Sequence, residues 1–151
     1  MKAVDRGRKS KLLATWLALI GGSFGMHRFY LHGARDPWAW CSVPLTLLGV
    51  YGLRRARQFG LDDHMSWLLL PVLGLMLAAG MLAAIIIGLT SDETWNARFN
   101  PAGANSSTGW LTIVGVLLAL ALGATALMAT IAFSAQRFFE YQADASPKAG
   151  A

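Results

Sequence analysis

The chain has 151 residues, of which 55% are hydrophobic and only 14% are charged, and its formal net charge is +5. Soluble domains carry roughly 25% charged residues, so this composition argues against a soluble domain and favours a membrane protein. The positive charge does not indicate a nucleic-acid partner, because the basic residues flank apolar runs, where they orient membrane spans. Cys41 is the one cysteine, which excludes an intrachain disulfide and a cysteine metal cluster.

Residues 1–11 are basic and come directly before an apolar run. A cleaved signal peptide begins in the same way, but no convincing small-residue cleavage site follows. We therefore expect residues 1–11 to be a basic cytoplasmic N-terminus. Its basic residues are Lys2, Arg6, Arg8, Lys9 and Lys11.

The first apolar run leads into a stretch rich in glycine and basic residues. Residues 12–26 would reach only about 22 Å as a helix, short of the ~30 Å hydrocarbon core, so the span is expected to continue over 12–31. Glycines here allow close backbone approach, and an arginine here should face protein, water or lipid headgroups. We interpret this stretch as the closed end of a membrane hairpin. Its notable residues are Gly21, Gly22, Gly25, His27, Arg28, Phe29, Tyr30 and Gly33.

A turn and a second apolar run complete this hairpin, which is expected to occupy residues 12–57. Asp36 is a candidate N-cap, because proline follows it at the favoured first helical position. The second span covers 37–53 and ends at three arginines within residues 54–57. Residues 58–66 then form a polar cytoplasmic linker.

Two longer apolar runs, 67–89 and 110–133, contain no charged residue. They predict a second helical hairpin over 67–137, with residues 91–109 as its outer loop and 138–151 as a polar tail. Trp95 and Phe99 lie four residues apart in this loop and could rest on the membrane surface.

The fold class is therefore all-α, an integral membrane bundle of four transmembrane helices at about 12–31, 37–53, 67–89 and 110–133. With both termini inside, the inner segments hold ten lysines and arginines and the outer segments hold three. By the positive-inside rule, both termini are expected to be cytoplasmic.

The run from Lys9 to Leu31 resembles the TM-two domain family, named for its two transmembrane helices. The shared pattern is a basic lead, a short apolar helix, Gly-Gly-x-x-Gly-x-His-Arg-Phe-Tyr-Leu, a turn and a second apolar helix, over about residues 9–55. His27 stands where eukaryotic relatives often have aspartate, which is typical of bacterial members. The chain departs from the family at His32, which precedes Gly33, and at the end of the second helix, which lacks the usual acid. The resemblance implies a topology and no reaction.

The His27-Arg28 pair has two readings. In the first, Arg28 binds a phosphate or carboxylate of a lipid or partner. In the second, Asp36 pairs with Arg28 or with Arg35, and the ion pair locks the turn. His27 and His32 are spaced poorly for a shared metal, and no third ligand is evident.

We find no nucleophile–base pair, phosphate loop or dinucleotide fingerprint, so we expect no enzymatic activity and no cofactor. The expected function is a non-enzymatic interaction or scaffold module of a bacterial inner membrane. Its partners would be membrane lipids and a protein partner or second copy. Small residues recur every four positions in the first, third and fourth spans, which predicts close helix packing either within the bundle or between two copies. A small transporter or channel subunit is the alternative, since short or broken helices often line transport sites.

Overall fold

The chain is almost entirely helical in the computed structural model, which describes residues 8–60, 62–101, 103 and 105–145. Most of the predicted basic N-terminus and the last residues of the polar tail lie outside the described residues. The helical segments are α1 (Lys11–Gly21), the 3-10 segment η1 (Gly22–Phe24), α2 (Met26–His32), α3 (Pro37–Phe59), α4 (His64–Leu89), α5 (Asp92–Phe99) and α6 (Trp110–Ala145).

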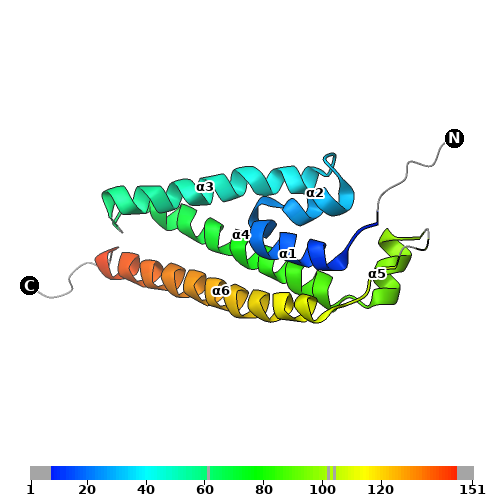
Figure 1. The fold of residues 1–151 in the computed structure, drawn as a ribbon. Helices are drawn as coiled ribbons and strands as arrows, with labels where there is room; N and C mark the ends of the chain where they lie inside the picture. Colours follow the sequence, from blue (N-terminus) through cyan, green and yellow to red (C-terminus); the bar gives the residue numbers. More distant parts are fainter. Residues whose placement is uncertain (1–7, 61, 102, 104, 146–151) are drawn as a thin grey trace, which may run out of the picture.

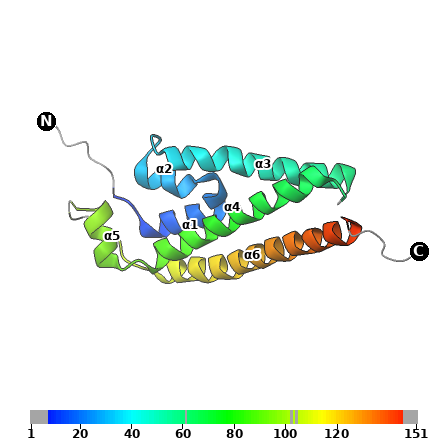
Figure 2. The ribbon, with the colours of Figure 1, turned by 180° about the vertical axis from the view of Figure 1, so that it is seen from behind.

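Three long helices form the body of the molecule. Figures 1 and 2 show α4 running between α3 and α6, with α1 and α2 occupying one half of the bundle beside α4. Helix α1 packs against both α4 and α6. Ala14, Ala18, Ala84 and Ala119 are fully buried in the hydrophobic core of that half, because small side chains allow helices to approach closely. The best-packed part of the molecule is therefore the half that holds α1.

Side-chain caps begin α3 and α4, and the sequence predicts the first of the two. The Asp36 carboxylate accepts a hydrogen bond from the Trp38 amide at 3.0 Å, and Pro37 is the first helical residue, so the predicted N-cap is confirmed. Asp63 accepts from the Ser66 amide at 3.0 Å and begins α4 in the same way. The predicted linker 58–66 is consequently short, because α3 extends to Phe59 and α4 begins at His64.

Among the described residues, two helices, α4 and α6, are long and apolar enough to cross a membrane. Only 28% of the most apolar window of α4 and 17% of that of α6 are buried inside the protein. The core helix of a soluble protein would be mostly buried, whereas these helices expose leucine, isoleucine and methionine along much of their length. Together with the composition, this indicates a membrane protein.

The predicted single span over residues 12–31 is wrong in its geometry. Instead of one rod, the structure has α1 of 11 residues, a 3-10 segment and α2 of 7 residues, which packs back against α1. The Ser10 amide, before α1, donates to the Tyr30 hydroxyl, near the end of α2, at 2.9 Å. A continuous helix would separate these residues by about 30 Å, so α1 and α2 form a hairpin, with the end of α2 beside the start of α1.

The N-terminal segment also meets the loop between α4 and α6. The Lys9 amide donates to the Asn100 side chain at 2.9 Å, and the Lys11 amide donates to the Ser106 hydroxyl at 3.1 Å. The segment that precedes α1 and the segment 91–109 therefore lie at the same end of the bundle, as Figure 1 shows. The four-span topology expected from the sequence places them at opposite ends.

Candidate functional site at the glycine-rich bend

The glycine-rich stretch is the bend between α1 and α2. Gly25 ends η1 with φ of 73°, in the left-handed region that favours glycine, and its amide donates to the Gly22 carbonyl at 3.0 Å. A Cβ on Gly25 would also lie 3.1 Å from the Ala39 carbonyl oxygen of α3. Both the backbone conformation and the contact with α3 therefore require glycine here.

Gly22 brings this bend against the middle of α4. A Cβ built on Gly22 would lie 2.6 Å from the Gly80 Cα, and one on Gly80 would lie 2.8 Å from the Gly22 carbonyl carbon. Thr46 of α3 fastens the other side, because its hydroxyl donates to the Ser23 carbonyl at 2.5 Å. The bend is thus held between α3 and α4 by close backbone packing and one buried hydrogen bond.

His27 lies in the first turn of α2 and is 9% exposed. Its Nδ1 has no hydrogen-bond partner among the described residues. His27 lines a cavity of about 270 Å³ together with Gly22, Gly25, Arg28, Ser42 and Gly80. Such a space can hold water or a small polar solute, and a buried nitrogen without a partner provides a place for one.

Arg28 points to the turn between α2 and α3. Its Nε donates to the Asp36 carboxylate at 2.9 Å, and the His32 Nδ1 lies 3.7 Å from the same carboxylate. Burial raises the pKa of Asp36, but the hydrogen bonds from Arg28 and from the Trp38 amide lower it by a larger amount. The pKa of Asp36 therefore lies below its ordinary value. Of the two pairings open to Asp36, the structure has the one with Arg28. The Arg28 side chain is still 39% exposed.

The remaining motif residues make packing contacts. Phe29 meets the Trp40 ring edge-on at 5.5 Å between centroids, and Tyr30 accepts the Ser10 hydrogen bond described above. Gly33 ends α2 with φ of 85°, and its amide donates to the Phe29 carbonyl at 2.9 Å. Gly21 is the last residue of α1 and lies beside the Met26 side chain.

A polar cluster at the start of α1, at the opposite end of that helix from the bend, is not evident from the sequence. Lys11 is 1% exposed, and its ammonium donates to the Thr108 hydroxyl at 2.7 Å, to the Asp92 carboxylate at 3.1 Å and to the Thr90 carbonyl. The Thr108 hydroxyl and amide, and then Lys11, lower the pKa of Asp92 to about 2. We call Lys11, Thr90, Asp92 and Thr108 the lysine cluster.

Trp95 and Asn100 complete the same end of the bundle. The Trp95 indole and the Asn100 amide both donate to the Lys9 carbonyl at 3.1 Å, and Trp95 is only 2% exposed. Trp95 therefore belongs to the core and does not rest on a membrane surface as the sequence suggested. The sequence signal for these contacts with Lys9 is the high content of asparagine, serine and threonine in residues 91–109. The same polar composition predicted an outer loop.

Residues 7–53 match the family model of the TM2 domain, which confirms the resemblance inferred from the His27-Arg28-Phe29-Tyr30 motif and its glycines. The match includes α1, η1, α2 and most of α3, and leaves α4, α5 and α6 outside. No curated protein and no solved structure matches the chain significantly.

Proposed function

We propose that this chain, whose residues 7–53 match the TM2 domain, is a multi-pass protein of a bacterial inner membrane that acts as a non-enzymatic interaction or scaffold module. The apolar, outward-facing surfaces of α4 and α6 support membrane insertion. Lys11 is held in an ion pair with Asp92, and Arg28 in an ion pair with Asp36, which supports a structural scaffold.

In this proposal α3, α4 and α6 cross the bilayer and α1–α2 is a re-entrant hairpin. Helix α1, at 11 residues, reaches about 16 Å, whereas α3, at 23 residues, reaches about 35 Å, compared with a hydrocarbon core of ~30 Å. Irregular backbone at membrane depth is tolerated where protein covers it, and α3 and α4 cover η1. Three crossings place the two termini on opposite sides, in contrast to the sequence expectation that both are cytoplasmic.

The distribution of basic residues gives an orientation for this topology. The end that carries the N-terminus has eight lysines and arginines in the sequence, and the end that carries the α3–α4 turn has five. The positive-inside rule then places the N-terminus and residues 91–109 in the cytoplasm and the C-terminus outside.

The observation that carries the interaction role is the exposed turn between α2 and α3. Arg28 is 39% exposed although Asp36 holds it, and Trp38, in the first turn of α3, is 71% exposed. An arginine beside an exposed tryptophan suits an anionic headgroup or an acidic partner segment at the membrane interface. We expect this surface to be where the module makes contact.

Photocrosslinking in native membranes tests this role. With Cys41→Ser as background, a cysteine-linked photocrosslinker at Trp38→Cys should give one reproducible adduct: another protein, a second copy, or an anionic lipid enriched over the control site. Met128→Cys on α6, where Met128 is 69% exposed, is the matched control and should capture lipid only. Adding Arg28→Ala should weaken the Trp38→Cys adduct. Equal lipid-only labelling at both sites would contradict an interaction module.

A small transporter is the second candidate, because α1 and α2 form a broken helix that lines the cavity holding His27. Against it, the described helices carry no ionisable residue in 67–89 or 110–133, where an ion path usually needs several. Flux measurements in proteoliposomes separate the two candidates. Specific, saturable transport that His27→Ala abolishes would favour the transporter over the scaffold.

A further inference from the structure

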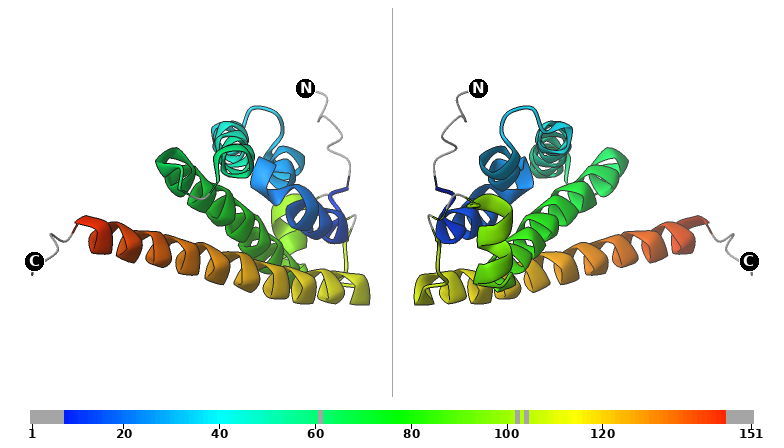
Figure 3. Two further views of the ribbon diagram at one scale, coloured as in Figure 1. Left: turned by 90° about the vertical axis from the view of Figure 1, so that its left-hand side faces the viewer. Right: turned by 90° about the vertical axis from the view of Figure 1, so that its right-hand side faces the viewer.

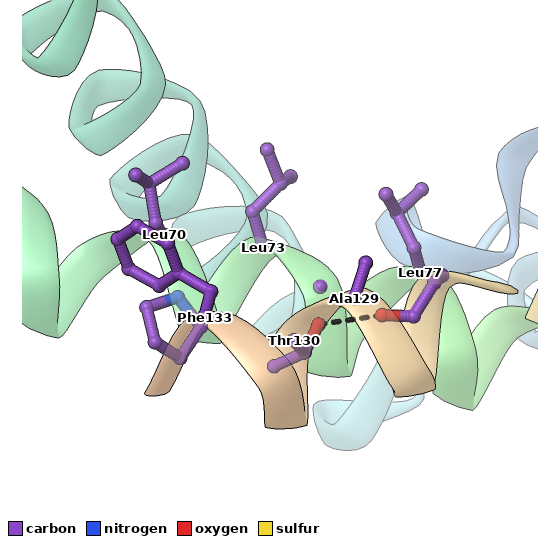
Figure 4. A pocket seen from close by; sticks show the side chains of 9 residues that line it. Leu70, Leu73, Leu77, Ala129, Thr130 and Phe133 are labelled. Atoms are coloured by element: carbon purple, nitrogen blue, oxygen red, sulfur yellow. Dashed lines mark hydrogen bonds between the residues drawn. The ribbon is translucent and has the colours of Figure 1, made fainter. Parts of the chain in front are cut away.

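A hollow lies along the seam between α4 and α6, on helices that the TM2 domain match does not include. It has a volume of about 250 Å³, and Figure 4 shows several of the side chains that line it: Leu70, Leu73, Leu77, Ala129, Thr130 and Phe133. Its lining is hydrocarbon, because the Thr130 hydroxyl donates to the Ala126 carbonyl of its own helix at 2.7 Å. The hollow therefore suits an alkyl chain.

A second hollow, of about 300 Å³, continues the same seam toward the ends of α4 and α6 that lie near the α3–α4 turn. It is lined by His64, Trp67, Ser134, Arg137 and Tyr141. Positions 67, 71 and 74 of α4 and 130, 134 and 137 of α6 are three or four residues apart, so the two hollows lie on the same helix faces. Figure 3 shows α4 and α6 diverging toward this end.

Arg137 is the charged residue of the second hollow. Its side chain is 12% exposed, and its guanidinium carbon lies 5.5 Å from the ring centroids of both Trp67 and Phe133. One terminal nitrogen donates to Glu140 at 2.7 Å. The Nε is buried and has no hydrogen-bond partner among the described residues. A buried arginine donor without an acceptor is expected to have one in the protein's working environment.

We propose that this seam binds one membrane phospholipid, with the headgroup phosphate on Arg137 and an acyl chain in the hollow between Leu70 and Phe133. Ala126 and Arg137 are eleven positions apart, about 16 Å along α6, which matches the ~15 Å depth of one leaflet. Trp67 and Tyr141 are side chains that favour the level of the headgroups. A phosphodiester, with one negative charge, suits this site better than a dianionic phosphate, because the Glu140 carboxylate is close to the guanidinium.

Native mass spectrometry of the purified full chain, titrated with dipalmitoyl phosphatidylethanolamine, tests the proposal. Arg137→Ala should weaken binding about ten-fold, as expected for the loss of a charge-assisted hydrogen bond. Arg57→Ala is the matched control, because Arg57 is an exposed arginine near the same end of the bundle, and it should leave the affinity unchanged. Dipalmitoylglycerol has the acyl chains but no phosphate. It should bind the unaltered protein about as weakly as the phospholipid binds the Arg137→Ala variant.

The apolar half of the site is tested separately, so that the proposal remains testable even if Arg137→Ala does not fold. Ala129→Phe fills the hollow from an exposed position and should weaken phospholipid binding, whereas Ala121→Phe, exposed on α6 outside the hollow, should not. Equal affinities of Ala129→Phe and Ala121→Phe, or of Arg137→Ala and Arg57→Ala, would overturn the proposal. Inorganic phosphate that binds as tightly as the phospholipid would overturn it too. A dimer that Ala129→Phe disrupts while lipid affinity stays unchanged would assign the seam to a second copy instead.

Discussion

The two ends of the bundle are built in opposite ways. At the N-terminal end, the lysine cluster, Trp95 and Asn100 fasten residues 9–11 to the α4–α6 connection through buried hydrogen bonds, and α1 fills the space between α4 and α6. At the other end, α4 and α6 diverge, and the seam between them is hollow. The difference teaches that polar contacts between distant residues, and not apolar length, place the first helix in the bundle. Because the Ser10 amide also donates to the Tyr30 hydroxyl, the end of α2 lies beside the start of α1, and the two helices form a hairpin.

Removing the Lys11 ammonium should destabilise the N-terminal end of the bundle more than any other change considered. Lys11→Met leaves Asp92 and Thr108 without their buried cation, and we expect the free energy of unfolding to fall by about 3 kcal/mol, the lower part of the range for a broken buried pair because Asp92 is partly exposed. Denaturant unfolding in detergent micelles measures this. Arg57→Met, at the other end, should change stability little, and equal effects of the two variants would contradict the contrast between the ends.

The contact between the bend and α4 should be the next most sensitive. Gly80→Ala places a methyl group against the Gly22 backbone, which cannot move as a side chain can, so we expect a loss of about 2 kcal/mol. Gly109→Ala is the control, because the methyl group that it adds would have no atom within 4 Å beyond its neighbours in the chain. The same unfolding measurement checks both variants, and a neutral Gly80→Ala would show that the bend is not packed on α4.

The hydrogen bond that ties α3 to the bend should have a smaller effect. Thr46→Val keeps the shape of this 1% exposed side chain but removes its hydrogen bond to Ser23, for an expected loss of about 1 kcal/mol. Thr125→Val removes a comparable hydroxyl from an exposed position on α6 and should be close to neutral. If both variants lose the same stability, the buried hydrogen bond adds nothing specific to the bend.

Acid should weaken the fastened end by the smallest amount. Thr108 and Lys11 lower the pKa of Asp92 to about 2, from an ordinary value near 3.9 in unfolded chains. A carboxylate with a depressed pKa stabilises the fold above about pH 4, and this stabilisation is lost as the pH falls toward 2. Melting temperatures between pH 5 and 2.5 should therefore fall less in Asp92→Asn than in the unaltered chain. If the melting temperatures of Asp92→Asn and of the unaltered chain fall equally with pH, the Asp92 carboxylate does not contribute this stability.

Much of the helical pattern could be predicted from the sequence, because apolar runs and caps are local signals. The runs 67–89 and 110–133 lie within α4 and α6, and Asp36 caps α3 as expected. The motif around Arg28 was assigned to the correct family.

The path of the first helix could not be predicted, because it depends on contacts between distant residues. Lys11 meets Asp92 and Thr108, which lie about eighty or more positions away in the sequence, and Gly22 meets Gly80. Hydropathy measures only how apolar a run is, so it cannot distinguish a hairpin that returns from a rod that crosses. The insufficient length of residues 12–26 was the one local sign, and it was interpreted as a span that continued over α2.

Cysteine labelling of the full chain in right-side-out membrane vesicles tests the re-entrant hairpin most directly. With Cys41→Ser as background, single cysteines at Arg8, Ser107 and Gln58, all exposed, are treated with a membrane-impermeant maleimide. The account predicts that Arg8→Cys and Ser107→Cys behave alike and that Gln58→Cys labels from the opposite side. Labelling of Ser107→Cys from the side opposite to Arg8→Cys would show that residues 12–31 cross the bilayer and would contradict the account.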